Sequence, residues 1–178
     1  MRRICVFCGS KSGTSPRHAE TARLLGEALV RRGLGLVYGG GNIGLMGVLA
    51  DAVLAAGGNV IGVIPRFLMD REFGHPGVSE LLVVESMHER KAVMAERADA
   101  FVALPGGFGT ADELFEILTW RQLHLHDKPI GLLNAGGFFD PLLAWLDTMV
   151  REGFVKQYNR NLIVVADDVD QLLDRCTV

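Results

Sequence analysis

The sequence predicts a single α/β domain, a Rossmann-like, doubly wound parallel sheet flanked by helices. Short apolar runs typical of buried strands alternate with segments of helical character along all 178 residues. Glycine-bearing loops follow three of the predicted strands, at Gly9, 39–41 and 106–109. No repeat, low-complexity tract or linker divides the chain, so we expect one domain, residues 1–178.

Each element is predicted from a local pattern. Strands are expected where short runs rich in Val, Ile, Leu and Phe occur, at 3–7, 34–38, 60–64, 81–84, 99–104, 129–133 and 162–165. Helices are expected where a capping residue precedes an amphipathic segment, at about 15–32, from the glycine run 39–47 to about 57, and at 86–97, 113–121, 140–152 and 168–175. Segment 66–80 lacks clean periodicity, so we expect a loop with a short helix there, a candidate lid.

Bulk composition narrows the possible partners. The chain is 49% apolar and 22% charged, with a net charge of −3 and a pI near 5.9, which argues against nucleic acid or an anionic membrane as partner. No apolar run reaches membrane-spanning length, and the opening MRRICVFCGS leads directly into a Gly-Ser turn, which favours a first strand over a signal peptide. We expect a cytoplasmic protein.

The most informative stretch is 105–113, PGGFGTADE, between a predicted buried strand and a predicted helix. Gly106, Gly107 and Gly109 remove side chains from the turn, so backbone N–H groups can approach a ligand. With Thr110 as helix N-cap, the helix start would favour an anion, most often phosphate. Glu113 has two possible roles: partner of Thr110 in a capping box, or a carboxylate facing another part of the ligand.

A second glycine run, GGGNIGLMG at 39–47, fits G-x-G-x-x-G after a strand and before a helix. The acid that supports a dinucleotide site is missing, because the next strand ends in Ile64-Pro65. We therefore expect a turn that lets the helix pack closely and that brings backbone to a mononucleotide. The carboxyl-edge loops should gather at the switch point of the sheet, as a nucleotide or sugar-phosphate pocket.

The segment 86–91, SMHERK, predicts a helix start, because Ser86 and Glu89 form a capping box. Arg90 and Lys91 then lie in the first turn, where cations are disfavoured by about 0.3–1 kcal/mol. Both could be solvated surface charges. The unfavourable placement of Arg90 suggests instead that it grips a phosphate or carboxylate.

Other chemically active side chains give weaker signals. Glu116 could be a second carboxylate or a partner of Arg121. His88 is expected on a helix surface, and His124 and His126 at a helix end. Cys5 and Cys8 should be buried on opposite faces of the first strand. No Cys/His cluster has metal-ligand spacing, so we expect no metal and no cofactor.

Together these stretches resemble the LOG (Lonely Guy) family of cytokinin riboside 5′-monophosphate phosphoribohydrolases. The hallmark PGGxGTxxE is present at 105–113, and an MHxRK segment at 87–91. CVFCGS at 5–10, VYGGGNIGLMG at 37–47 and KPIGLLN at 128–134 match as well, so the resemblance covers nearly the whole chain. It implies cleavage of the N-glycosidic bond of AMP or N6-prenyl-AMP, which releases the base and ribose 5-phosphate.

By the same resemblance, Arg90 and Glu113 are catalytic, and Gly106, Gly107, Gly109 and Thr110 hold the 5′-phosphate. The resemblance also implies a homodimer. The matched motifs place further residues in the substrate site: Ser10, Gly40, Gly41, Met87 and Lys91.

Two other functions stay open at this point. One is a non-catalytic nucleotide-binding protein, like the related molybdenum-cofactor carriers, and the other is a phosphoribohydrolase for a different nucleoside monophosphate. Retention of both Arg90 and Glu113 favours an enzyme. Family members have also been labelled lysine decarboxylases, but the chain shows no recognisable pyridoxal phosphate site.

Overall fold

The computed structural model describes residues 1–177, and the side chains of all of these except Asp70 and Glu72. This part of the chain forms one seven-stranded parallel sheet in the order β4-β3-β2-β1-β5-β6-β7. The strands lie within a residue or so of their predicted positions: β1 (Arg3–Phe7), β2 (Gly35–Tyr38), β3 (Val60–Pro65), β4 (Glu80–Val84), β5 (Ala100–Ala103), β6 (Ile130–Leu133) and β7 (Ile163–Ala166).

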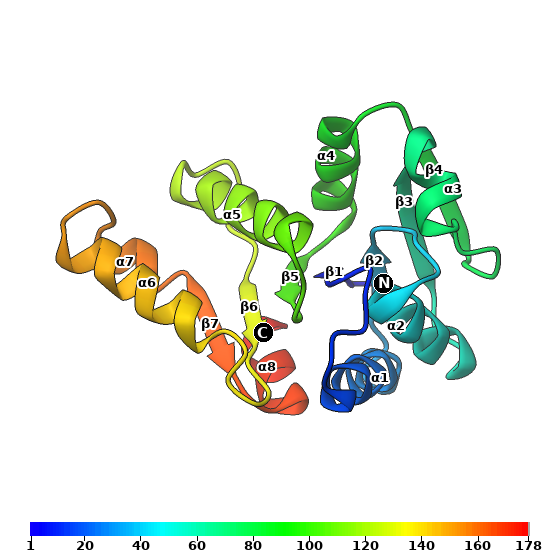
Figure 1. The fold of residues 1–178 in the computed structure, drawn as a ribbon, viewed down its shortest axis with the longest axis horizontal. Coiled ribbons are helices and arrows are strands. Elements are labelled where there is room, and N and C mark those ends of the chain that lie inside the picture. The colour runs from blue at the N-terminus through cyan, green and yellow to red at the C-terminus, as the bar shows by residue number, and fades with distance from the viewer. Residues whose placement is uncertain (178) are drawn as a thin grey trace.

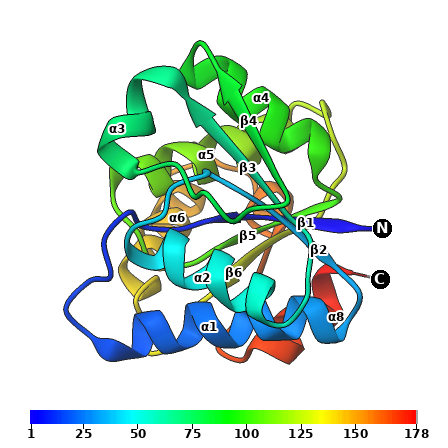
Figure 2. The ribbon, with the colours of Figure 1, turned by 90° about the vertical axis from the view of Figure 1, so that its right-hand side faces the viewer.

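Helices cover both faces of the sheet, as predicted (Figures 1 and 2). One face packs against α1 (Pro16–Arg31), α2 (Gly44–Ala55) and α8 (Val169–Cys176). The other face packs against α4 (Met87–Arg97), α5 (Phe108–Gln122) and α6 (Asp140–Arg151). The short elements are η1 (Arg66–Leu68), α3 (Met69–Glu72) and α7 (Gln157–Arg160), of which α7 was not predicted.

Because side chains alternate along a strand, the sheet separates two hydrophobic cores. Cys5 belongs to the core under α4 and α5, whereas Cys8 belongs to the core under α1 and α2. Both are buried, as expected for side chains on opposite faces of the first strand. The helices α4 and α5 therefore share one core, which includes Met94 and Leu114.

The strand order reverses between β1 and β5, which are neighbours in the sheet. Along the chain, 92 residues lie between the last residue of β1 and the first residue of β5. At their carboxyl ends, the Gly9 N–H donates to the Pro105 carbonyl oxygen at 3.1 Å. The loops after β1 and β5 thus meet at the switch point, as the glycine pattern predicts.

Segment 66–80 contains the expected short helix and is tied to the loop after β2. The Asn42 N–H donates to the Phe73 carbonyl at 3.0 Å, and the His75 N–H donates to the Gly40 carbonyl at 2.9 Å. The His75 ring also lies 3.1 Å from an Asp51 carboxylate oxygen. Nothing in residues 1–177 forms a helix long and apolar enough to cross a bilayer.

The start of α5 corrects one prediction. The helix begins at Phe108, with Gly107 as N-cap, so Thr110 lies inside the first turn and is not the cap. The alternative in which Thr110 and Glu113 form a capping box is therefore wrong. Glycine has low helix propensity, and the apolar periodicity begins only at Leu114, so the pattern hid the first turn. In the capping box predicted at the start of α4, Ser86 Oγ accepts from the Glu89 N–H at 3.1 Å, as expected. The Glu89 carboxylate accepts from the Glu85 N–H at 2.8 Å, one residue before the N-cap.

Candidate active site

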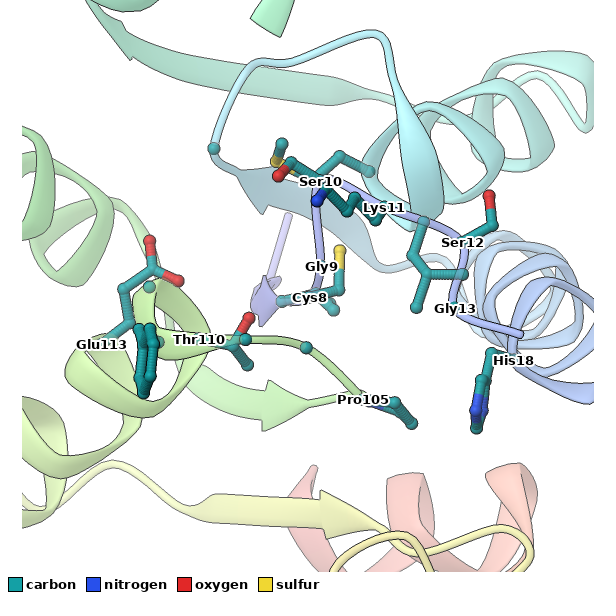
Figure 3. Close-up of a pocket in the computed structure, with 18 of the residues that line it drawn as sticks. Cys8, Gly9, Ser10, Lys11, Ser12, Gly13, His18, Pro105, Thr110 and Glu113 are labelled. Carbon is teal, nitrogen blue, oxygen red and sulfur yellow. The ribbon is translucent and has the colours of Figure 1, made fainter. Parts of the chain in front are cut away.

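A cavity of about 380 Å³ opens at the carboxyl edge of the sheet, over the switch point. Its size is in the range of small-molecule sites. Its walls come from the loops after β1, β2 and β5 and from the helices α4 and α5. Figure 3 shows Glu113 at one end and the segment from Lys11 to His18 at the other, with Thr110 and Pro105 between them.

The glycine turn after β5 forms one wall. Its residues Pro105, Gly106, Gly107 and Gly109 line the cavity together with Thr110. The first backbone bond of α5 runs from the Ala111 N–H to the Gly107 carbonyl at 3.1 Å, so the N–H groups of 108–110 precede the helical hydrogen-bond ladder. These amides and the positive end of the helix dipole favour an anion here.

Arg90 reaches the cavity from α4, and it is only 5% exposed. Its Nη2 donates to the Gly39 carbonyl oxygen at 2.7 Å, and its Nε donates to the Val63 carbonyl oxygen at 3.1 Å. The alternative of a solvated surface charge is therefore wrong for Arg90. Since the guanidinium is fixed by backbone atoms, it presents its charge to the cavity in one orientation.

Glu113 reaches the same cavity from α5 and is 8% exposed. The charges of Arg90 and Glu113 both act on Cys5, which lies in the core beneath them. Burial raises the pKa of the Cys5 thiol well above its usual value, Glu113 raises it further, and Arg90 lowers it. A buried cation and a buried carboxylate thus belong to one low-dielectric site, where electrostatic effects are strong.

The structure brings together most of the predicted site. The predicted residues that line the cavity are Ser10, Arg90, Gly106, Gly107, Gly109, Thr110 and Glu113. Four others lie outside its lining. Met87 supports Arg90, with its Sδ 4.0 Å from Arg90 Nη1. Gly40 packs on β3 with a φ of +76°, and Gly41 forms a bridge with Gly74.

Lys91, the fourth residue outside the lining, faces α5. Its Nζ lies 3.0 Å from Asp112 Oδ2 and 3.1 Å from Glu116 Oε2. Glu116 is thus a partner of Lys91 and not of Arg121, whose guanidinium donates to the Lys128 carbonyl. His88 is exposed on α4, as expected.

The loop between β1 and α1 and the first turn of α1 contribute residues that sequence reasoning missed. Lys11, Ser12, Gly13 and His18 line the cavity, and the His18 ring meets Phe138 edge to face at 5.8 Å between ring centroids. Their position after a switch-point strand was the available signal. Contact with Phe138, 120 residues away, has no local signature.

The second glycine run packs as predicted. Gly44 has a φ of +61°, and a Cβ there would lie 2.3 Å from the Ser10 carbonyl carbon. The Leu45 N–H donates to the Gly9 carbonyl at 3.0 Å. The missing side chain therefore lets α2 begin directly against the loop after β1. Among residues 1–177, no three His, Cys, Asp or Glu side chains gather closely enough to hold a metal ion.

Comparisons with known proteins agree with these observations. Residues 46–176 match the family described as "Possible lysine decarboxylase". The chain is 53% identical over 171 residues to the probable cytokinin riboside 5′-monophosphate phosphoribohydrolase LOGL1 of Oryza sativa subsp. japonica, covering 96% of this chain and 77% of the relative. It is 51% identical over 172 residues to cytokinin riboside 5′-monophosphate phosphoribohydrolase LOG2 of Arabidopsis thaliana, covering 97% and 81%.

Among solved structures, the molybdenum cofactor binding protein of the phototrophic bacterium Rippkaea orientalis shares the fold, with a TM-score of 0.73. It is 21% identical, and the alignment covers 98% of this chain and 94% of that protein. This likeness concerns the fold alone, whereas the relatives at about half identity align with nearly the full length of this chain. The chain belongs to the LOG family of cytokinin riboside 5′-monophosphate phosphoribohydrolases.

Proposed function

We propose that the protein hydrolyses the N-glycosidic bond of N6-substituted adenosine 5′-monophosphates and of AMP, releasing the free base and ribose 5-phosphate. One observation carries the proposal: Arg90 and Glu113, from different helices, line one cavity together with the amide-bearing start of α5. The relatives named for this activity are about half identical to the chain.

The 5′-phosphate docks on the start of α5. The backbone amides of 108–110, the helix dipole and the Thr110 hydroxyl form an anion site of the kind that binds phosphate. Ser10 contributes from the opposite wall. Gly40, Gly41 and Met87 act indirectly. The two glycines shape the loop after β2, whose Gly39 carbonyl binds Arg90, and the Met87 side chain contacts the guanidinium.

Glu113 acts at the ribose. A phosphate at the first turn of α5 leaves the ribose over the next turn, where the Glu113 carboxylate lines the cavity. There it stabilises an oxocarbenium-like transition state or takes a proton from the attacking water. The water oxygen bonds to the anomeric carbon, the C–N bond breaks, and its electron pair leaves with the base, which gains a proton.

Arg90 holds negative charge in place. With Nε and Nη2 fixed on backbone carbonyls, its guanidinium orients the phosphate or the Glu113 carboxylate and assists departure of the base. No step needs a cofactor.

We further propose a homodimer in the cytoplasm. Support for a dimer comes from large apolar side chains that are exposed in the single chain. Phe108, which lines the cavity, is 97% exposed. Support for the cytoplasm comes from three cysteines that are all free thiols. Light scattering after size-exclusion chromatography tests the dimer.

To test this proposal, the protein is incubated separately with AMP, N6-isopentenyl-AMP and adenosine, and free base is detected by chromatography. We expect base from the monophosphates and none from adenosine, because the phosphate site is then empty. Glu113→Gln should lower kcat by about 10²–10⁴-fold and keep nucleotide binding. Full turnover by this variant would refute the assignment of Glu113.

Two alternatives give different results. Tight nucleotide binding without base release would indicate a carrier protein, which the presence of Arg90 and Glu113 in the cavity does not favour. Base release from another nucleoside monophosphate only would change the substrate and keep the reaction.

A further inference from the structure

We infer that Lys91 is a positioning residue, which holds α4 and α5 in the placement that brings Arg90 and Glu113 to one cavity. The inference rests on the proposed function and assigns Lys91 a role outside substrate binding. It starts from the observation that Lys91 does not line the cavity, although its neighbour Arg90 does.

The contact joins two helices that follow different strands. Lys91 lies on α4, which follows β4, and both of its partners lie on α5, which follows β5 (Figure 1). Asp112 and Glu116 are one helical turn apart, so they present their carboxylates on one face of α5. The Lys91 ammonium binds both, at 3.0 and 3.1 Å, and its side chain is only 10% exposed.

The ion pair is adjacent in sequence to both catalytic residues. Arg90 precedes Lys91, and Glu113 follows Asp112. Arg90 is anchored towards β2 and β3 by the carbonyls of Gly39 and Val63. Glu113 moves with α5. The Lys91 contact thus links the anchored half of the site to the helix that carries the other half.

Electrostatics make this link costly to break. Burial would lower the pKa of Lys91, but its contacts with Asp112 and Glu116 outweigh this effect and raise the pKa, so the ammonium stays charged. Removing it leaves two carboxylates one turn apart, which repel each other. The Glu116 side chain is only 21% exposed, and a partly buried carboxylate without its partner is unfavourable, so the start of α5 should shift away from α4.

The test compares five full-length variants: K91M, K91R, the double variant D112N/E116Q, the triple variant K91M/D112N/E116Q, and K128M. Lys128 is the matched control, because its Nζ also binds α4, by donating to the Ala95 carbonyl at 2.8 Å, and takes no part in the Lys91 contact. Rates are measured with AMP and N6-isopentenyl-AMP, and hydrogen exchange is followed in peptides that cover 108–116.

A misplacement of about 1 Å in an active site can lower the rate by about 10²-fold. We expect K91M to lower kcat by about this factor, with a smaller change in KM, and D112N/E116Q to lower it similarly. Combining all three substitutions should add little, because they break one contact. K91R should recover most of kcat, and K128M should stay within about twofold of the parent protein.

A direct substrate contact would give the opposite pattern: K91M would raise KM, and D112N/E116Q would retain kcat because the lysine keeps its charge. That result would overturn the inference. Thermal unfolding identifies a variant that fails to fold, in which case D112N/E116Q and K91R decide. If the parent protein releases no base, the proposed function fails, and hydrogen exchange alone decides the inference. Unchanged exchange at 108–116 in K91M would then refute it.

Discussion

Gly106 and Thr110 are in such close contact that a Cβ on Gly106 would lie 2.0 Å from Thr110 Oγ1 and 2.6 Å from its Cβ. Thr110 is itself buried, so it has little room to move. The cavity wall at the start of α5 therefore depends on a missing side chain.

Gly106→Ala should lower the free energy of unfolding by about 1–3 kcal/mol, the usual cost of overpacking. It should also weaken AMP binding, because the displaced turn no longer aligns its amides. Gly107→Ala is the control for stability, since its Cβ would meet no heavy atom within 4 Å. Urea unfolding and calorimetric titration with AMP measure the two effects. Equal stability of both variants would contradict the steric argument.

Arg90→Lys should lower kcat/KM by about 10²-fold or more, because a positioned donor in a dry site contributes about that much. A lysine has one ammonium group and cannot reach the Gly39 and Val63 carbonyls with the planar geometry of Nε and Nη2. Arg97→Lys, on the exposed surface of α4, is the matched control and should retain activity. Steady-state kinetics decide, and a fully active Arg90→Lys enzyme would exclude a geometric role.

We expect the free energy of unfolding to fall as the pH is lowered, because of His126. Burial lowers its pKa, and the ring accepts the Lys128 N–H at Nδ1 while Nε2 lies 3.0 Å from the Ile117 carbonyl. The folded state therefore prefers the neutral ring, and the unfolded state takes up the proton first as the pH falls below about 6.5. The contribution of His126 to the free energy of unfolding is therefore fully present above a pH of about 6.5. It is lost as the pH falls through the pKa that His126 has in the folded state.

The measurement is urea unfolding at several pH values between 7.5 and 5. His126→Gln should flatten the decline relative to the parent protein, while His88→Gln, on the exposed surface of α4, should follow the parent curve. An unchanged slope in His126→Gln would mean that other groups cause it.

Cys5 and Cys176 should be unreactive in the folded protein. Burial raises the pKa of the Cys5 thiol well above its usual value and that of Cys176 to about 11, so little thiolate exists at pH 8. In a Cys8→Ser variant, a thiol reagent at pH 8 should label neither residue until denaturant is added, and both afterwards. Rapid labelling of the native variant would show that the cores open readily.

The sequence was sufficient for the sheet and for most of the site, because both depend on local patterns. Buried parallel strands are short apolar runs, and the glycines at Gly9 and Gly106 mark the loops that meet at the switch point. The first turn of α5 was missed because its glycines conceal helical periodicity.

Other features depend on contacts between distant residues. Lys91 looked like a surface or substrate-binding charge until the structure showed Asp112 and Glu116 beside it. The approach of Phe138 to His18 follows from how the start of α1 meets the loop before α6. Neither contact has a signature within its own segment, so tertiary packing alone reveals them.

The anchors of Arg90 have a consequence for how the site can change over evolutionary time. Gly39 and Val63 hold the guanidinium through peptide oxygens, which every amino acid possesses. At position 63 the anchor survives any replacement that the core accepts, whereas at position 39 a Cβ would collide with Arg90 Nη2. The anchor at position 63 is thus insulated from mutational drift, whereas the anchor at position 39 requires glycine. If Lys91 positions α5 as we infer, its two carboxylate partners must be inherited together with it.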